Sequence, residues 1–392
     1  MSRPLVAALV EPGPAGLAAL LPPLRAALDG TGPAVALLPL DPVPAARIEV
    51  ALRPDDRDAP LENDHIAVVV ATSGSTGEPK GVLLTAAALT ASAQAAQQHL
   101  GGPARWLLAI PAQHVGGLQV VLRALLAGGE PEVVADSSPA AFVIAARRLA
   151  AASDGAPRRT SLVPTQLRRL LAVASSAAEL RGFDTVLLGG AAAPPALLEQ
   201  ARAAGVRVVP TYGMSETSGG CVYAGTALPG VQVEVDDGLV RLAGPTLAAG
   251  YRLRPDLTAE AFVGGWFVTG DLGRLRRDGR LEVLGRADDV IVTGGEKVAP
   301  AAVEAALAEH PAVAEVAVAG VPDPEWGARV MAAVVLRVGA SLTLAQAREH
   351  VAARLGRVAA PRELRLLTAL ARLPSGKVDL VALVDGGSRV SR

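Results

Sequence analysis

The chain has 392 residues, of which 51% are hydrophobic, and its formal net charge at pH 7 is −1. A chain of this length can bury large cores and is expected to form two or more domains. The near-zero charge and the aromatic content of 3% argue against nucleic acid as a partner. Polar residues interrupt every long apolar run, so we expect no membrane span.

The single cysteine, Cys221, rules out an internal disulfide and fits a reducing cytoplasm. The N-terminus has a short apolar patch, but Glu11 and several prolines follow early, so we expect no signal peptide and a cytoplasmic protein.

Lysine is rare in this chain. The 37 basic residues include only Lys80, Lys297 and Lys377, which leaves 34 arginines. A compact ammonium cannot always be replaced by a planar guanidinium, so these three lysines are candidates for chemistry. All three are predicted to lie in glycine-rich loops.

The first part of the chain alternates predicted helices and strands. Helices are expected at 14–28, 85–100, 118–127, 139–151, 164–174 and 195–204. Strands are expected at 34–38, 66–70, 106–110, 132–135, 160–163, 185–188 and 206–210. This alternation favours mostly parallel sheets flanked by helices.

The pattern of predicted elements changes after about residue 225. Short strands at 231–235, 239–242, 266–268 and 281–284 predict a small β-rich unit packed on the α/β core. Beyond about residue 288, helices at 300–309 and 342–355 and strands at 313–321, 329–336 and 364–367 predict an α+β unit. We therefore expect an α/β protein with a large N-terminal domain (1–287) and a small C-terminal domain (288–392).

One polar stretch follows the apolar strand expected at 66–70. It reads Thr72-Ser73-Gly74-Ser75-Thr76-Gly77-Glu78-Pro79-Lys80-Gly81. Glycines let successive N–H groups converge on an anion, hydroxyls add donors, and the lysine adds a positive charge. The order differs from the Walker loop, because Lys80 follows Glu78-Pro79 and precedes Gly81. The stretch predicts a polyphosphate-binding loop, and the alternative is a polar surface loop.

Further stretches occur in a fixed order with this loop. They are Thr211–Thr217, Thr269-Gly270-Asp271, Gly285-Arg286-Ala287-Asp288-Asp289, Gly294-Gly295-Glu296 and Ser375-Gly376-Lys377. Together they resemble the acyl-adenylate-forming superfamily of acyl-CoA synthetases, adenylation domains and luciferases, from about residue 66 to 380. The resemblance implies ATP and Mg²⁺ as cofactors and CoA as co-substrate. It also implies a two-step reaction in which a carboxylic acid is adenylated and then transferred to the CoA thiol.

Three other stretches resemble the o-succinylbenzoate–CoA ligases of menaquinone synthesis within that superfamily. They are Pro111–Gly117, Ser161–Leu167 and Leu187–Ala191. The acid is therefore expected to be o-succinylbenzoate.

The resemblance implies two sets of nucleotide contacts. The phosphate contacts are Thr72, Ser73, Gly74, Ser75, Thr76, Gly77 and Lys80, with Thr211 and Ser215 at the α-phosphate and Glu216 as the Mg²⁺ ligand. The nucleoside contacts are Gly190, Ala191, Tyr212, Gly213 and Met214 near adenine, with Asp271 and Arg286 near ribose. Taken alone, Asp271 after Thr-Gly is also typical of a structural turn, and Glu216 could merely cap a helix.

The acid is expected to contact a separate set of residues. These are His114, Gly117, Thr165, Gln166, Gly190 and Ser218. His114 is either a catalytic or pocket-wall residue or an ordinary hydrogen-bonded loop histidine. The partner of a second substrate carboxylate stays open among the 34 arginines.

The resemblance also implies that the C-terminal domain is mobile. Asp288 is implied as the hinge, and Lys377 as the residue that reaches the carboxylate and α-phosphate during adenylation. Gly294 and Gly295 are implied to replace it during thioester formation, and Lys297 is a candidate contact for CoA. A homodimer is the family-level expectation.

Three alternatives remain open at this point. The protein could be a different aryl or acyl acid–CoA ligase, or an adenylation enzyme that loads a carrier protein. The third alternative is a nucleotide- or acyl-binding protein without catalysis.

Overall fold

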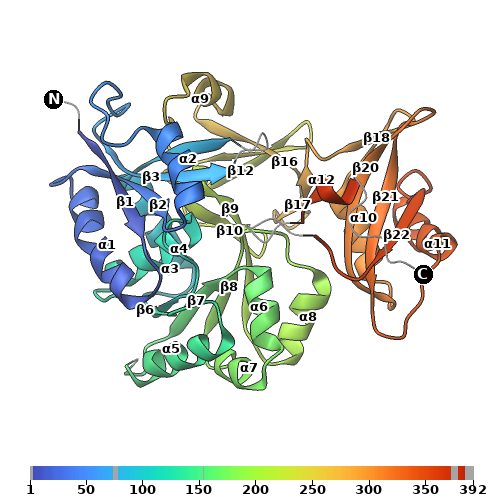
Figure 1. The fold of residues 1–392 in the computed structure, drawn as a ribbon, viewed down its shortest axis with the longest axis horizontal. Coiled ribbons are helices and arrows are strands. Elements are labelled where there is room, and N and C mark those ends of the chain that lie inside the picture. Colours follow the sequence, from blue (N-terminus) through green and yellow to red (C-terminus); the bar gives the residue numbers. More distant parts are fainter. Residues whose placement is uncertain (1–2, 74–77, 153, 372–377, 385–392) are drawn as a thin grey trace.

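The computed structural model describes residues 3–73, 78–152, 154–371 and 378–384, which form four β-sheets with helices packed on them (Figure 1). Three sheets lie together in the larger part of the molecule, and the fourth forms a smaller lobe built from the C-terminal residues. The predicted α/β class is therefore confirmed. The described part of the chain has no helix long and apolar enough to cross a membrane.

The first sheet has the strand order β1-β2-β3-β4-β14. Its strands are β1 (Leu5–Val10), β2 (Ala34–Pro39), β3 (Ile66–Ser73), β4 (Pro79–Thr85) and β14 (Gly250–Tyr251). β1, β2 and β3 are parallel to one another. Helix α1 (Gly13–Leu28) connects β1 to β2, and helix α2 (Pro42–Leu52) lies between β2 and β3. β4 then folds back antiparallel to β3, and β14 pairs antiparallel with β4. This last pairing brings residue 251 beside the glycine-rich stretch.

The second sheet has the order β11-β10-β9-β8-β7-β5-β6. Its strands are β5 (Arg105–Leu108), β6 (Glu132–Val133), β7 (Arg158–Leu162), β8 (Thr185–Leu188), β9 (Val208–Met214), β10 (Gly219–Tyr223) and β11 (Thr226–Ala227). Its helices are α3 (Ala86–His99), α4 (Val115–Leu126), α5 (Pro139–Ala151), α6 (Pro164–Leu171), α7 (Ala174–Leu180) and α8 (Pro195–Ala203). β5 to β9 are parallel, as predicted, and the hairpin of β10 and β11 runs antiparallel.

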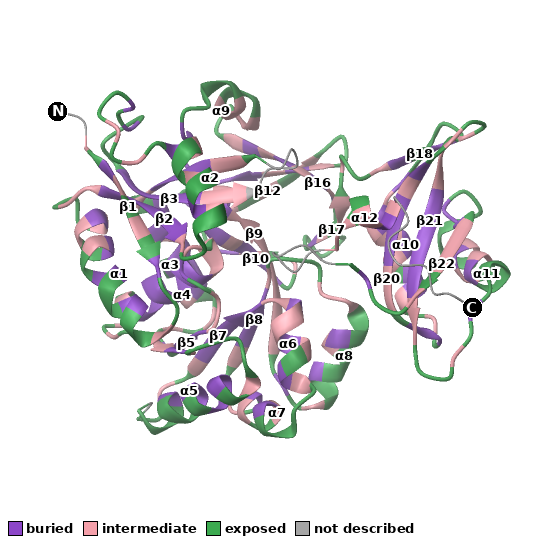
Figure 2. Ribbon diagram, in the orientation of Figure 1, coloured by how far each residue is buried: buried purple, intermediate pink, exposed green. Residues whose placement is uncertain are grey.

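The core lies between these two sheets. One hydrophobic cluster joins Val68 of the first sheet, Leu89 of α3, Leu118 of α4 and Trp106 of the second sheet. Buried residues accordingly line the inner strands in Figure 2. Apolar runs on the parallel strands fit burial on both faces. A second cluster fixes α5 to α8 against the other face of the second sheet.

The third sheet is the small β-rich unit. It consists of β12 (Gln232–Asp236), β13 (Leu239–Ala243), β15 (Phe262–Val263), β16 (Trp266–Leu275) and β17 (Leu281–Arg286), with α9 (Pro255–Ala261) before β15. β16 pairs with β17 so that Asp271 lies opposite Arg286. This register brings two of the predicted nucleotide residues together.

The fourth sheet belongs to the C-terminal lobe. It contains β18 (Ile291–Thr293), β19 (Glu296–Val298), β20 (Val313–Asp323), β21 (Gly327–Leu336) and β22 (Glu363–Leu367). Its helices are α10 (Pro300–Ala308), α11 (Leu344–Leu355) and α12 (Leu380–Val384). The lobe has its own hydrophobic cluster, which includes Val303, Val318 and Val351. An ion pair between Arg168 of α6 and Glu315 of β20 joins it to the larger part.

Several local predictions are wrong. Lys80 and Gly81 lie on β4 and not in a loop, and Lys297 lies on β19. Gly81 marks a close approach, since a Cβ there would lie 2.1 Å from a methyl carbon of Leu52. Thr211–Met214 belong to β9 and do not follow it.

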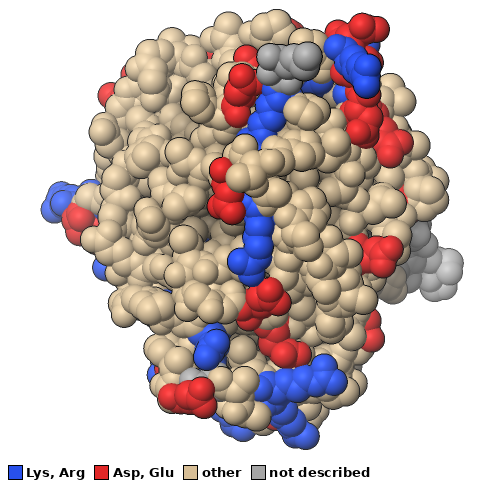
Figure 3. Space-filling view, turned by 90° about the vertical axis from the view of Figure 1, so that its left-hand side faces the viewer, with Lys and Arg blue, Asp and Glu red and all other residues tan. Residues whose placement is uncertain are grey.

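Arginine is also not confined to the surface in this protein. Arg123, Arg159 and Arg252 are buried, at 2%, 3% and 1% exposure. Carbonyl oxygens compensate the burial of Arg252, which donates to Leu52 O at 3.0 Å and also to the carbonyl of Ala59. On the face shown in Figure 3, basic and acidic side chains are intermingled and separated by broad uncharged surface.

Candidate active site

The pairing of β3 with β4 places the lysine of the glycine-rich stretch. Thr72 lies opposite Lys80 in this antiparallel pair. The side chain of Ser73 and residues 74–77, which were predicted to hold the phosphates, lie outside the described residues. Strand pairing thus holds Lys80 at the end of the hairpin where the connection between the two strands begins.

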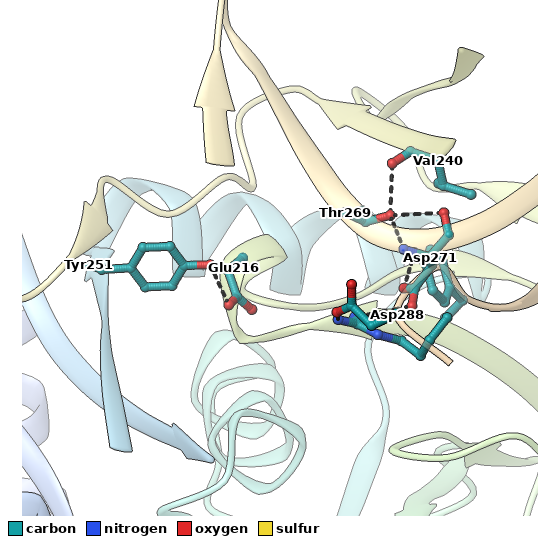
Figure 4. Close-up of polar contacts among 8 residues, drawn as sticks. Glu216, Val240, Tyr251, Thr269, Asp271 and Asp288 are labelled. Carbon is teal, nitrogen blue, oxygen red and sulfur yellow. Dashed lines mark hydrogen bonds and ion pairs between the residues drawn. The ribbon is translucent and has the colours of Figure 1, made fainter. Parts of the chain in front are cut away.

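Glu216 and Tyr251 meet beside Lys80. Glu216 lies on a short 3₁₀ helix (Ser215–Thr217) that follows β9. The Tyr251 hydroxyl donates a hydrogen bond of 2.9 Å to Glu216 Oε1 (Figure 4). The Lys80 ammonium lies 5.6 Å from the centre of the Tyr251 ring, within cation–π range. Three separate segments thus converge on one charged cluster.

The environment of Glu216 suits a cation ligand. Burial raises the pKa of this carboxyl group, while the Tyr251 hydroxyl and the charges of Lys80 and Arg286 act in the opposite direction. A hard divalent cation would favour the ionised carboxylate in such a place. The described residues contain no group of three or more His, Cys, Asp or Glu side chains that could hold a metal. A hard cation at Glu216 would take its further ligands from other oxygen atoms, such as those of bound phosphates, water or backbone carbonyls.

A second polar cluster lies at the predicted ribose end. The Tyr212 hydroxyl donates to Asp271 Oδ2 at 2.7 Å, and Arg286 lies 3.3 Å from Asp271 Oδ1. The Asp271 backbone N–H donates to Thr269 Oγ1 at 3.0 Å within β16 (Figure 4). Burial and the Asp271 carboxylate raise the pKa of Tyr212, so its hydroxyl stays a donor. Each carboxylate oxygen keeps a lone pair that a sugar hydroxyl could use.

Arg286 also reaches the predicted hinge. Its guanidinium lies 3.4 Å from the carboxylate of Asp288 as well as 3.3 Å from that of Asp271. A Cβ on Gly270 would lie 2.5 Å from this guanidinium, so a larger residue there would displace the Arg286 side chain. The ribose end and the start of the C-terminal lobe therefore share one arginine.

Close backbone approaches shape the predicted adenine side. A Cβ on Gly213 would lie 2.2 Å from the carbonyl oxygen of Gly219, and Met214 lies directly opposite that glycine. Thr211 Oγ1 donates to Leu188 O at 3.2 Å, which ties β9 to the segment carrying Gly190 and Ala191. Ser215, which follows β9, is buried. Backbone atoms rather than side chains therefore line this edge at Gly213, where the base is predicted to bind.

The predicted acid-binding residues differ in how free they are. Gln166 caps α6: its Oε1 accepts from Val163 N at 3.0 Å and its Nε2 donates to Ala109 O at 2.7 Å. Ser218 is fully buried, and its hydroxyl has no hydrogen-bond partner among the residues that the structure describes. Thr165 is partly exposed in the first turn of α6.

The start of α4 combines a histidine with a tightly packed glycine. His114 is the residue before the helix and makes no side-chain capping bond. His114 is exposed to solvent on one side. Nearby protein atoms still partly desolvate its imidazole ring, which lowers the pKa of the ring and favours the neutral form. Gly117 permits the sharp turn, because a Cβ there would lie 2.3 Å from two carbonyl oxygens.

The C-terminal lobe contributes the hairpin of β18 and β19. Gly294 and Gly295 form its turn with φ of +59° and +83°, and a Cβ on Gly294 would lie 2.6 Å from the Trp326 ring. Lys297 is exposed on β19. Lys377 lies outside the described residues, so its predicted place at the site stays a prediction.

Cys221 has no part in the chemistry. It is fully buried, and burial raises the pKa of its thiol to about 12. A thiol in that state is a poor nucleophile at neutral pH. This fits a reaction in which the acid and CoA supply the nucleophiles.

Tyr251 is the one residue of the cluster that the sequence does not single out. It follows Gly250 on a two-residue strand, far along the chain from Lys80 and Glu216. Only the pairing of β14 with β4 reveals its place.

Comparison with known proteins identifies the family. Residues 21–254 match the AMP-binding enzyme family, and residues 302–377 match the AMP-binding enzyme C-terminal domain. The chain belongs to the AMP-binding enzymes. Family membership accounts for the order of stretches described above and for the separate C-terminal lobe. ATP and CoA are substrates of AMP-forming CoA ligases within this family.

Two of the similar proteins are named as 2-succinylbenzoate–CoA ligases. The chain is 47% identical over 384 residues to a probable 2-succinylbenzoate–CoA ligase of Mycobacterium tuberculosis, covering 96% of this chain and 97% of that protein. It is 33% identical to a 2-succinylbenzoate–CoA ligase of Geobacillus kaustophilus, covering 91% and 75%.

Solved structures share the fold. One is the o-succinylbenzoate CoA synthetase of Bacillus subtilis in complex with its acyl-adenylate intermediate, with a TM-score of 0.75 and 27% identity over 100% of this chain and 89% of that one. Another is an amide bond synthetase of Marinactinospora thermotolerans, with a TM-score of 0.79 and 27% identity over 99% and 90%.

Proposed function

We propose that this protein is a 2-succinylbenzoate–CoA ligase that forms AMP. The observation that carries the proposal is the 47% identity to the mycobacterial relative of that name, over nearly the full length of both chains. The likeness to a structure containing the corresponding acyl-adenylate supports it. The polar cluster at Glu216 supplies groups suited to the phosphates of a nucleoside triphosphate, and the cluster at Asp271 supplies groups suited to its ribose.

The reaction has two displacements. In the first, an oxygen of the acid carboxylate attacks the α-phosphorus of ATP, and the bond to pyrophosphate breaks. In the second, the CoA thiolate attacks the acyl carbonyl, and AMP leaves with the electron pair of the broken C–O bond. Positioning and charge compensation are the main contributions a protein can make to such steps.

The described residues divide that work. Lys80 compensates charge on the β- and γ-phosphates, and Asp271 orients the ribose through the bonds that Tyr212 and Arg286 hold. Mg²⁺ bound to Glu216 and the phosphates would neutralise the charge that grows on pyrophosphate. The backbone edge at Gly213 admits the adenine ring.

The C-terminal domain (288–392) carries the second part of the proposal. It rotates about Asp288 between the two displacements, with Lys377 at the site in the first. Gly294 and Gly295 shape the path of the CoA thiol in the second, and Lys297 contacts CoA. Rotation of this kind keeps water from the adenylate. A cytoplasmic homodimer completes the proposal.

The experiment is thioester formation across a panel of acids. Purified protein is incubated with MgATP, CoA and one acid, and AMP and acyl-CoA are measured together. The panel is 2-succinylbenzoate, benzoate, a short fatty acid and sulfoacetate, the last because the chain is 35% identical to a sulfoacetate–CoA ligase over 83% of its length. We expect 2-succinylbenzoate to give the highest kcat/KM. A higher value for another acid would assign the protein to that acid, and AMP without thioester would indicate a carrier-protein acceptor.

A further inference from the structure

We propose that Tyr251 is a positioning residue that holds the Glu216 carboxylate and the Lys80 ammonium at a fixed separation, ready for the β- and γ-phosphates of MgATP. This inference rests on the proposed function only in that the site binds adenine nucleotides. It does not depend on which acid is activated.

Tyr251 contacts the two charged groups through different parts of one rigid side chain. Its hydroxyl donates to Glu216 Oε1 at 2.9 Å, whereas its ring face lies 5.6 Å from Lys80 Nζ. The ring itself packs edge-on against Phe262, with centroids 5.8 Å apart. A tyrosine needed only for packing would not have to meet a carboxylate and an ammonium at once.

Strand pairing explains why Tyr251 can reach both groups. Tyr251 lies opposite Val82 of β4, and Lys80 lies two residues before Val82 on the same face of that strand. The carbonyl of Glu216 accepts a 2.8 Å hydrogen bond from Ala248 N, just before β14. The backbone around Tyr251 is therefore tied to both of the elements that carry its partners.

The neighbouring residues make this arrangement stiff. Arg252 N donates to Gly81 O at 2.7 Å, and the buried Arg252 side chain donates to Leu52 O at 3.0 Å. The Tyr251 N–H donates to Thr258 Oγ1 at 2.9 Å. A side chain anchored on both sides loses little freedom when a ligand binds, so its contacts are pre-organised.

The test compares nucleotides that do and do not carry the β- and γ-phosphates. Binding of MgATP, ATP with EDTA, and AMP is measured by titration calorimetry for the wild type, Tyr251→Phe and Tyr251→Leu. The matched control is Tyr223→Phe, which removes another buried hydroxyl, one that Arg123 contacts at 3.1 Å in the same hydrophobic cluster.

Tyr251→Phe keeps the ring and removes the bond to Glu216. We expect its affinity for MgATP to fall about tenfold or more, as for loss of a hydrogen bond to a charged group, with AMP affinity within about twofold of the wild type. Tyr251→Leu also removes the ring beneath Lys80, so ATP with EDTA should weaken as well. Tyr223→Phe should leave the ratio of MgATP to AMP affinity unchanged.

Two outcomes would overturn the inference. An equal loss for AMP and MgATP in Tyr251→Phe would mean that the hydroxyl only supports the fold, and unchanged MgATP binding would mean that it positions nothing. Failure of the wild type to bind either nucleotide would instead overturn the proposed function. AMP binding by each variant serves as the check that it is folded.

Discussion

Replacing Asp271 with asparagine should remove most of the discrimination for the ribose hydroxyls. The substitution keeps the size of the side chain but replaces an ionised acceptor with a neutral amide. In the structure the carboxylate is largely buried, at 12% side-chain exposure, and its oxygens face Tyr212 at 2.7 Å and Arg286 at 3.3 Å. A sugar hydroxyl that joins them would therefore donate to a well-fixed, charged acceptor.

The magnitude follows from two hydroxyl-to-carboxylate bonds. At about 1.5 kcal/mol each, they favour AMP over 2′,3′-dideoxy-AMP by about 3 kcal/mol, or roughly a hundredfold. A neutral amide would retain about half of that energy, so the Asp271→Asn variant should discriminate only about tenfold. The Arg286 side chain is 45% exposed, so loss of its ion pair should cost the fold no more than about 1 kcal/mol.

The assay is calorimetric titration of both nucleotides into each protein. Asp236→Asn serves as the control, because Asp236 pairs with Arg241 at 2.9 Å in the same sheet but is 64% exposed. The control should keep the full discrimination. Undiminished discrimination in Asp271→Asn would refute the assignment of the ribose to this carboxylate.

Four further predictions concern other parts of the molecule. Gly213→Ala should abolish nucleotide binding and destabilise the fold by about 3 kcal/mol or more in urea titrations, because its Cβ would lie 2.2 Å from Gly219 O; a normal affinity would contradict the close approach. Burial raises the pKa of Glu304, so its unfavourable contribution to the free energy of folding grows as pH rises through that pKa. Glu304→Gln should therefore unfold at higher urea than the wild type at pH 7 but not at pH 4, and parallel pH profiles would contradict this. Lys377→Ala should block adenylation yet largely spare thioester formation from supplied acyl-adenylate, whereas equal loss in both would refute that division. Lys297→Ala should raise the KM for CoA and leave that for ATP unchanged, and an unaltered KM for CoA would exclude the contact.

The sequence predicts the layers of the fold because its signals there are local. Apolar runs such as that in β3 and the alternation of helices and strands are visible within short windows. α2 also has a local signal, since Asp41 caps it and Pro42 stands at its first position, but a second proline, Pro44, and three β-branched residues argue against a helix. Strand β4 is harder to predict, because Pro79 and Gly81 are residues typical of loops. Their place in a strand depends on the pairing of β4 with β3 and β14.

The site is predictable in its parts but not in its connections. Glu216, Asp271 and Lys80 stand in stretches that the family resemblance marks. The contacts of Tyr251 with Lys80 and Glu216 do not follow from spacing, because the strand that carries Tyr251 pairs with a strand remote in sequence. The hairpin of β16 and β17, in contrast, brings Asp271 and Arg286 together as the resemblance implies. Buried Arg252 is missed for the same reason, since its carbonyl partners lie in segments far from it along the chain.

The central claim is that this chain adenylates 2-succinylbenzoate. The most direct measurement is exchange of labelled pyrophosphate into ATP in the absence of CoA, with each acid of the panel added in turn. We expect exchange that depends on 2-succinylbenzoate and on Mg²⁺ and exceeds that with every other acid. Binding of ATP without exchange for any acid would contradict the account and indicate a nucleotide-binding protein without catalysis.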